Sequence, residues 1–397
     1  MSKVALFVLA CLVLGCGKNE VTIKINGGDG RQVRLDANSL EFKFNRLVDA
    51  GTFNFPGIKS GTYTVGVVAG TYLDMRDVVV EAPPLSGVEN YEVVFDIPAG
   101  SNSGSKAEGT IVFSSKPSSG RERNWDLFTV KADGSQLQQL TDTPENEQHP
   151  SWSPDGKKIA FTQGEVMTNF DIYVINEDGS GRVRLTEHAE RDQEPAWSPD
   201  GSKIAFVSTR DGDKAIWVMD ADGGNKKKVI VGRAPAWSPD GKKLAFVSDQ
   251  FDGSDEVYLV DVDGSNRQRM TDNIKKFDWF PAWSADGSQL VFNSERFGGQ
   301  ELIAMKADGS DQMRLTVAEK TYEIDPVWSP DGKAVAYSGK IDTAAVRMWE
   351  MDGEDYDIFI VETTGFNVDD MTKASGMPIN LTKSPDREDK SPSWRAF

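Results

Sequence analysis

A seven-residue pattern, Pro-x-Trp-Ser-x-Asp-Gly, occurs five times in this chain of 397 residues, and a truncated sixth copy stands at its end. The six tryptophans are separated by 45, 40, 46, 45 and 66 residues; they are Trp152, Trp197, Trp237, Trp283, Trp328 and Trp394. A period of about 40–50 residues is typical of a repeat array in which each repeat is one supersecondary unit. The fold must therefore place similar units at regular intervals along the chain.

Each repeat consists of four short runs with turn residues between them. The first run ends in Trp-Ser and leads into a Pro-Asp-Gly turn, in which proline presets φ and glycine accepts a positive φ. In one repeat, a second run at 243–246, a third at 256–260 and an Asp-Gly turn at 263–264 follow, and the last run ends at Met270-Thr271. The alternation and the turn spacing predict four β-strands joined by hairpins, with no helical period.

A four-stranded sheet that repeats around an axis is a propeller blade. One tryptophan per repeat is large enough to fill the space between neighbouring sheets. The chain ends are complementary, because residues 393–397 form a first strand without a second and residues 109–115 form a second strand without a first. Pairing the two removes an open sheet edge. The sequence therefore predicts an all-β fold whose six-bladed propeller, residues 109–397, is closed by the C-terminal strand.

These Trp-Ser-Pro-Asp-Gly repeats resemble those of the TolB-like propeller family, and the resemblance covers residues 109–397. The resemblance implies a six-bladed propeller, a role in the bacterial cell envelope and binding of other envelope proteins. Soluble TolB carries an α/β domain before its propeller, whereas the N-terminal part of this chain has a different pattern. We therefore transfer no partner contact from the family to individual residues here.

The first sixteen residues are typical of a bacterial lipoprotein leader. Lys3 precedes the apolar run 4–14, and Val-Leu-Gly-Cys at 13–16 resembles a lipobox. The run is too short for a permanent membrane-spanning helix. We predict a signal peptide over 1–15, lipidation at Cys16 and a tether over 16–19, with the lipid as the only membrane attachment. The alternative is an ordinary secretory signal in which this cysteine has no role.

The residues after the cysteine bear on location. Gly17 is not the aspartate that retains enteric lipoproteins at the inner membrane, so we expect attachment to the outer membrane, facing the periplasm. Lys18-Asn-Glu20 is compatible with a surface-export signal, which makes the cell surface the alternative location.

Residues 20–98 form a second, smaller predicted domain. Alternating runs, among them 21–25, 61–68 and 91–95, are separated by turn residues, which predicts a small β-sandwich. The segment Phe-Pro-Gly-Ile-Lys-Ser-Gly-Thr-Tyr-Thr-Val at 55–65 resembles an edge of transthyretin-like and carboxypeptidase-regulatory-like modules. The Gly/Ser-rich residues 99–108 are predicted to be a flexible linker.

Composition argues against several classes of function. A net charge of −18 disfavours nucleic acid as a partner. The two cysteines, Cys11 and Cys16, belong to the leader and its lipidation site, so no disulfide and no thiolate metal site are expected. The chain has two histidines, His149 and His188, and neither a Gly-x-Ser-x-Gly elbow nor a phosphate-binding loop. We expect no catalytic residue, no metal, no cofactor and a monomer that is not an enzyme.

The variable residues before each Pro-x-Trp are the candidate binding site. The innermost strand of a blade lines the central channel, so these residues ring one channel mouth. These and the residues just upstream are mainly acidic or aromatic; the candidates are His149, Asp192, Glu194, Arg233, Asp278, Phe280, Glu323 and Asp325. Such a mouth suits a basic or extended peptide. The alternative is a rim that only binds water.

The sequence as a whole predicts a non-catalytic lipoprotein that binds an envelope protein or a basic peptide through its propeller. One alternative is a polysaccharide lyase or hydrolase, which would need a cluster of His, Glu and Arg around a metal or sugar in the channel. The other is a scaffold that binds through an insertion in the sixth blade, at residues 339–378, where the wide last spacing of 66 residues arises.

Overall fold

The computed structural model describes strands between residues 19 and 96 and, further on, residues 108–117, 124–165, 169–250, 253–272, 276–296, 299–316, 321–341, 356–363, 378–382 and 387–395. The chain divides into two compact units, Met1–Gly104 and Ser105–Phe397. All regular structure in the described residues is β, and none of it is helical. The predicted signal peptide, the lipidation site at Cys16 and the linker at 99–107 lie outside the described residues.

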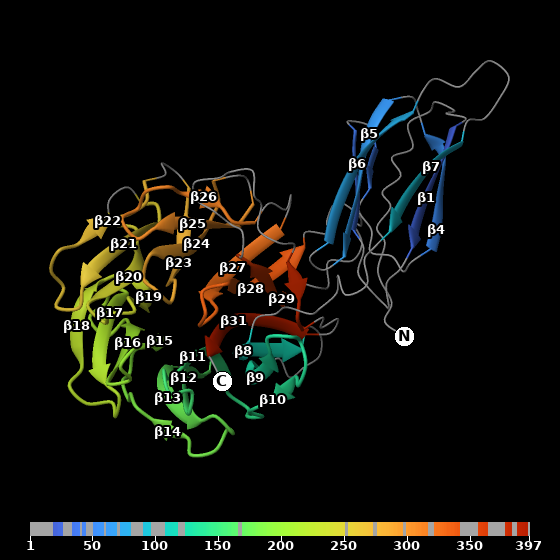
Figure 1. Ribbon diagram of the computed structural model, residues 1–397. Coiled ribbons are helices and arrows are strands. Elements are labelled where there is room, and N and C mark those ends of the chain that lie inside the picture. Colours follow the sequence, from blue (N-terminus) through green and yellow to red (C-terminus); the bar gives the residue numbers. More distant parts are fainter. Residues whose placement is uncertain are drawn as a thin grey trace. The chain divides into compact units, whose positions relative to one another are not determined.

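The N-terminal unit contains two sheets among its described residues (Figure 1). One has the order β4-β1-β7 and is built from β4 (Gly51–Ile58), β1 (Asn19–Asn26) and β7 (Asn90–Asp96). The other has the order β3-β2-β5-β6; its strands are β3 (Phe42–Phe44), β2 (Arg34–Ser39), β5 (Gly61–Ala69) and β6 (Tyr72–Val80). Packing of these sheets into a β-sandwich stays a prediction.

The C-terminal unit is a propeller of six four-stranded blades (Figure 1). From the innermost strand outward, blade 1 consists of β31 (Arg387–Arg395), β8 (Thr110–Pro117), β9 (Asp126–Lys131) and β10 (Gln138–Gln139). Blade 2 consists of β11 (Asn146–Trp152), β12 (Lys158–Gly164), β13 (Phe170–Asn176) and β14 (Val183–Arg184). Blade 3 consists of β15 (Asp192–Trp197), β16 (Lys203–Ser208), β17 (Ala215–Asp220) and β18 (Lys227–Val231).

The other three blades repeat this order. Blade 4 consists of β19 (Arg233–Trp237), β20 (Lys243–Ser248), β21 (Glu256–Asp261) and β22 (Gln268–Arg269). Blade 5 consists of β23 (Asp278–Trp283), β24 (Gln289–Ser294), β25 (Glu301–Lys306) and β26 (Met313–Arg314). Blade 6 consists of β27 (Thr321–Trp328), β28 (Ala334–Ile341), β29 (Asp357–Glu362) and β30 (Ile379–Asn380). Most of the predicted insertion in blade 6 lies outside the described residues.

The ring closes where the last strand meets the first blade. β31 pairs antiparallel with β8, with Trp394 opposite Ile111 and Arg395 opposite Thr110. The innermost strands contact one another in a cycle, so β31 touches both β11 of blade 2 and β27 of blade 6. The prediction of six blades closed by the C-terminal strand is confirmed.

Apolar side chains fill each space between neighbouring blades. Trp152 of blade 2 packs with Val112 and Leu127 of blade 1, and Trp328 of blade 6 packs with Val291 and Leu302 of blade 5. The other four tryptophans occupy the equivalent clusters. Burial of one large apolar side chain contributes about 1.5–3 kcal/mol. The repeated tryptophan is therefore a packing residue, as the sequence predicts.

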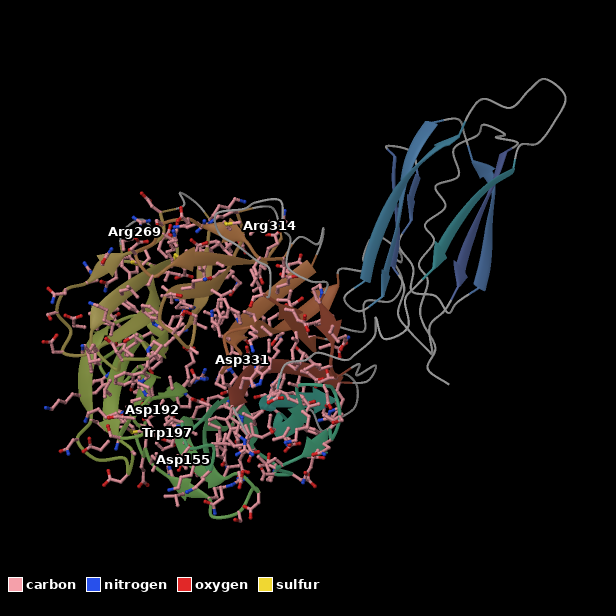
Figure 2. All side chains as sticks on the ribbon, viewed as in Figure 1. Asp155, Asp192, Trp197, Arg269, Arg314 and Asp331 are labelled. Carbon is pink, nitrogen blue, oxygen red and sulfur yellow. The ribbon has the colours of Figure 1, made fainter. Side chains whose placement is uncertain are left out.

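The repeated polar residues form hydrogen bonds within the blades. In the Trp-Ser-x-Asp-Gly turn, Ser153 Oγ donates to Asp155 Oδ1 at 2.7 Å, and Ser329 Oγ donates to Asp331 Oδ1 at 2.7 Å. Figure 2 labels the two aspartates. In the Met-Thr segment, Val257 N donates to Thr271 Oγ1 at 3.0 Å, a bond that recurs in other blades. These residues belong to the scaffold of the propeller.

Arginines of the outermost strands join these networks. Arg269 in β22 and Arg314 in β26 lie toward the outer edge of the propeller (Figure 2). Their Nη2 atoms lie 3.0 Å and 2.9 Å from Oε1 of Glu256 and Glu301, the first residues of the neighbouring strands. Partly buried bonds between charged groups are stronger than neutral ones. They hold the short outer strands on their blades.

Arg395 connects the closing strand to blade 2. It stands where the complete repeats have serine, and its Nη1 donates to the Gly156 carbonyl oxygen and to Glu177 Oε2, the latter at 2.6 Å. Its guanidinium carbon lies 4.1 Å from the centroid of a Trp152 ring. A charged hydrogen bond and a cation–π contact each contribute about 1–2 kcal/mol. The truncated sixth copy thus fastens the ring through a side chain that the other copies lack.

We predict that Arg395→Ala lowers the free energy of unfolding by about 2 kcal/mol, because it removes both contacts across the closing interface. Urea denaturation followed by tryptophan fluorescence measures this loss. The control is Lys242→Ala, which removes a cation whose side chain is 80% exposed. A loss for Arg395→Ala no larger than that of the control would contradict the role of this residue in ring closure.

Candidate binding site at the channel mouth

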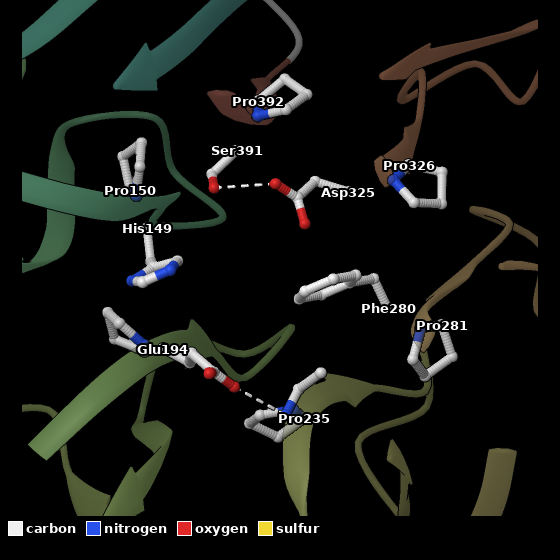
Figure 3. A pocket seen from close by; sticks show the side chains of 12 residues that line it. His149, Pro150, Glu194, Pro235, Phe280, Pro281, Asp325, Pro326, Ser391 and Pro392 are labelled. Atoms are coloured by element: carbon white, nitrogen blue, oxygen red, sulfur yellow. Dashed lines mark hydrogen bonds between the residues drawn. The ribbon is translucent and has the colours of Figure 1, made fainter. Parts of the chain in front are cut away.

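The residues before the six prolines lie together around the channel axis (Figure 3). They line a pocket of about 160 Å³, to which each innermost strand contributes one residue and the proline that follows it. The pairs are residues 149–150, 194–195, 234–235, 280–281, 325–326 and 391–392. Since liquid water occupies about 30 Å³ per molecule, the pocket has room for roughly five waters or one side-chain head group.

A β-bulge in each innermost strand sets this geometry. The residue before each proline has a positive φ, between 51° and 55°, although none of the six is glycine. The pairing register shifts at the same place, for example between Gln148 and Ser151 in β11. A bulge leaves one residue unpaired and changes the direction of its side chain. A left-handed conformation is about 1–2 kcal/mol less favourable for a non-glycine residue, and six residues at the channel mouth adopt it.

Two carboxylates line the pocket from opposite blades. Opposite blades of a six-membered ring are three apart, so Glu194 of blade 3 stands across from Asp325 of blade 6. Ala234 N donates to Glu194 Oε2 at 2.7 Å, and Ser391 Oγ donates to Asp325 Oδ2 at 2.9 Å (Figure 3). Each carboxylate is thus oriented by a bond from the next blade in the ring.

An imidazole and an aromatic ring form a second opposite pair. His149 comes from blade 2 and Phe280 from blade 5, and both side chains lie in the pocket (Figure 3). His149 Nδ1 is buried, and no residue in the described part of the chain forms a hydrogen bond with it. The pocket therefore combines negative charge, a ring face and an unpaired imidazole nitrogen in one small volume.

The environment of Asp325 raises the pKa of its carboxyl. Although Asp325 is half-buried by solvent accessibility, the narrow channel encloses its carboxyl with protein, and this desolvation is the main cause of the raised pKa. His149 and the Ser391 hydroxyl lower this pKa, and the negative charge of Glu194 raises it. The two acids therefore influence each other across the axis.

Four of the eight predicted residues line the pocket, namely His149, Glu194, Phe280 and Asp325. Asp192 and Asp278 do not, because both are fully buried at the start of their strands. Arg210 Nη2 donates to Asp192 Oδ2 at 2.8 Å, and Arg296 Nη2 donates to Asp278 Oδ2 at 2.8 Å. Their ion pairs belong to the blade interior.

Glu323 and Arg233 also lie outside the pocket. Glu323 is 2% exposed and accepts hydrogen bonds from Thr316 Oγ1 and from Leu302 N, the latter at 3.3 Å. Arg233 forms an ion pair with Asp255. A regular strand would place residues two apart on the same face, but the bulge redirects the second of them. This is why Asp192 is buried, whereas Glu194, two residues later, lines the channel mouth.

The prolines are pocket residues that were not among the predicted site residues. They are six of the twelve lining residues and are buried. Each proline directly follows a predicted mouth residue, so its position in the repeat could have indicated that it lines the pocket.

Among the described residues, no group of three or more His, Cys, Asp or Glu is placed to hold a metal ion. The same residues include no helical segment of the length and hydropathy that crossing a bilayer requires.

We predict opposite outcomes for two acids that are two residues apart. Asp192→Asn removes the buried anion of the Arg210 ion pair and should lower the free energy of unfolding by about 3 kcal/mol. Glu194→Gln keeps an acceptor for Ala234 N and should change it by less than about 0.5 kcal/mol. Chemical denaturation of both variants measures this. Equal losses would show that the division into scaffold and mouth acids is wrong.

We further predict a pH-dependent effect of Asp325→Asn. Because the folded-state pKa is raised, ionised Asp325 destabilises the native protein above that pKa, and the penalty disappears as pH falls through the window between it and 3.8. Asp325→Asn should therefore stabilise the protein at pH 7 and lose this advantage in acid. Denaturation of wild type and variant at several pH values tests the sign. Stabilisation that grows in acid would contradict it.

Comparison with known proteins places this geometry in a family. The chain matches the family described as TolB beta propeller domain over residues 163–233 and 230–371, more than half of its length. TolB from Acinetobacter baumannii has a similar structure, with a TM-score of 0.60 and 21% identity over 86% of this chain and 81% of that one. A TolB structure from Agrobacterium tumefaciens has a TM-score of 0.53 and 19% identity, covering 73% of this chain and 100% of that one.

A curated relative matches a short segment only. Dipeptidyl-peptidase 5 of Porphyromonas gingivalis is 55% identical over 40 residues, which are 10% of this chain and 6% of that protein. The match spans about the length of one repeat, and the activity of that enzyme does not carry over to this chain. The six blades, the repeat and the family match agree, and the chain belongs to the TolB beta-propeller family.

Proposed function

We propose that this protein is a non-catalytic binding protein of the bacterial cell envelope, which holds a basic segment of another envelope protein or peptide at its channel mouth. The observation that carries the proposal is the convergence of six left-handed residues into one pocket with two carboxylates. Strained backbone persists where the surrounding structure enforces it, and such residues cluster at functional sites. A structural plug would not need charged side chains in this position.

Charge supports a basic partner. The chain has a net charge of −18, and acids in a concave site attract and orient a cationic segment. Glu194 and Asp325 are the two anionic side chains that line the pocket, and neither lysine nor arginine lines it. The site thus complements positive charge on the partner.

The arrangement of polar groups favours binding over catalysis. In a Ser-His-Asp triad, the histidine stands between the serine and the acid. Here the Ser391 hydroxyl donates directly to Asp325, and His149 Nδ1 has no hydrogen-bond partner among the described residues. This order does not activate the hydroxyl as a nucleophile.

The leader sequence supports the proposed location. Lys3, the apolar run 4–14 and the Val-Leu-Gly-Cys segment support export and lipidation at Cys16. We place the lipid anchor in the outer membrane with the propeller in the periplasm, since Gly17 is not an inner-membrane retention residue. The partner would then be a protein or peptide of the same compartment.

Photo-crosslinking in native envelopes tests the function. Phe280 in the pocket is replaced by p-benzoylphenylalanine, and the matched control replaces Val183, which is 55% exposed on the outermost strand β14. We expect a discrete partner adduct from position 280 and none from 183, with the partner identified by mass spectrometry. Adducts from probes within 342–355 but none from 280 would instead favour binding through the blade 6 insertion.

A further inference from the structure

The pocket has the dimensions of a site for one head group. Its volume of about 160 Å³ exceeds that of a few waters but does not accommodate a folded element. Six of its twelve lining residues are buried prolines, whose rings have no donors and a fixed backbone φ. The shape therefore restricts what enters along the axis to a single extended chain end or side chain.

The two carboxylates keep unused acceptor capacity. An ionised carboxylate can accept about four hydrogen bonds. In the described part of the chain, Glu194 accepts through Oε2 from Ala234 N and Asp325 accepts through Oδ2 from Ser391 Oγ. Oε1 of Glu194 and Oδ1 of Asp325 have no partner among those residues. Each acid can therefore accept a further hydrogen bond from a cation that enters the pocket.

We propose that the pocket binds a single primary ammonium group, a lysine side chain or an N-terminal amine of the partner, between Glu194 and Asp325. This inference rests on the proposed function and narrows it from a basic segment to one inserted head group. An ammonium has three donors around a compact charge, so it can contact two opposed acids at once. The Phe280 ring lines the same pocket and can add a cation–π contact.

Other ligand classes fit less well. A planar guanidinium forms its best contacts side-on with one carboxylate rather than between two opposed ones. A metal ion prefers several oxygen or nitrogen ligands in a defined shell, and no group of three or more His, Cys, Asp or Glu is so placed among the described residues. An anion would meet two carboxylates. The ammonium is the cation whose donors match this arrangement.

Binding of the ammonium should depend on pH through the protonation of Asp325. Desolvation is the main cause of the raised pKa of Asp325, and the charge of Glu194 raises this pKa further, because the two acids repel each other when both are ionised. A cation between them offsets this repulsion, and protonation of Asp325 removes it. Binding should therefore weaken as pH falls through the raised pKa of Asp325.

The two histidines provide a built-in reporter for the test. His149 lies in the pocket, and His188 is exposed in the loop after β14, so the side-chain NMR signals of the purified full chain report the site and a control. The probes are N-acetyl-lysine N-methylamide and N-acetyl-norleucine N-methylamide, which differ in the ammonium. We expect the lysine probe to shift the His149 signal saturably, with His188 unchanged and the norleucine probe without effect.

Variants of the two acids test whether Glu194 and Asp325 are needed for binding of the lysine probe. Glu194→Gln and Asp325→Asn keep an acceptor for the bonds from Ala234 and Ser391, and each should weaken lysine-probe binding about tenfold or more. The matched control is Asp272→Asn, which changes a side chain that is 77% exposed on the outer part of blade 4 and should leave binding unchanged. Loss of binding in the control variant as well would overturn the proposal, because it would indicate general charge attraction.

Three further outcomes overturn the ammonium proposal. They are no His149 shift with the lysine probe, tighter binding of N-acetyl-arginine N-methylamide, and a saturable shift with calcium chloride but not with the lysine probe. The proposed function is tested separately by crosslinking from position 280. If that crosslink forms while the lysine probe fails, the mouth binds a partner through other chemistry, and only the inference about the head group is lost.

Discussion

Pairing between β31 and β8 is the interaction on which the rest of the propeller depends. Each blade buries its apolar faces only against its two neighbours, so the clusters between blades form a cycle. If the last strand were released, blade 1 would lose its inner strand, and the Trp394 and Trp152 interfaces would both be exposed. The channel mouth also depends on this pairing, because its six lining positions come from six different blades.

Repetition and variation have separate roles in this chain. The tryptophan, serine, aspartate and glycine of each repeat form contacts inside or between blades, and these contacts are nearly the same from blade to blade. The bulge at each proline is equally regular in its φ values. It nevertheless presents a different side chain each time. The scaffold thus fixes the backbone at six positions around the channel axis, whereas the residue type differs at each of them.

Much of this arrangement could be predicted from the sequence. The period identified the blades, the incomplete ends identified the closure, and the residue before each proline identified the mouth. The sequence did not reveal that Asp192, Asp278 and Glu323 lie outside the pocket, because strand alternation alone does not show a bulge, and a non-glycine residue before proline gives no sign of a positive φ. Their burial depends on partners far along the chain, such as Arg210 and Arg296, which the repeat pattern does not pair.

A crystal structure of the full chain soaked with N-acetyl-lysine N-methylamide at neutral pH tests the central claim most directly. The account predicts the ammonium nitrogen on the channel axis, within hydrogen-bond distance of Glu194 Oε1 and Asp325 Oδ1, with the six bulges unchanged. A probe bound elsewhere, or a channel whose prolines had moved apart to admit a longer segment, would contradict the account of a rigid mouth built for one cationic head group.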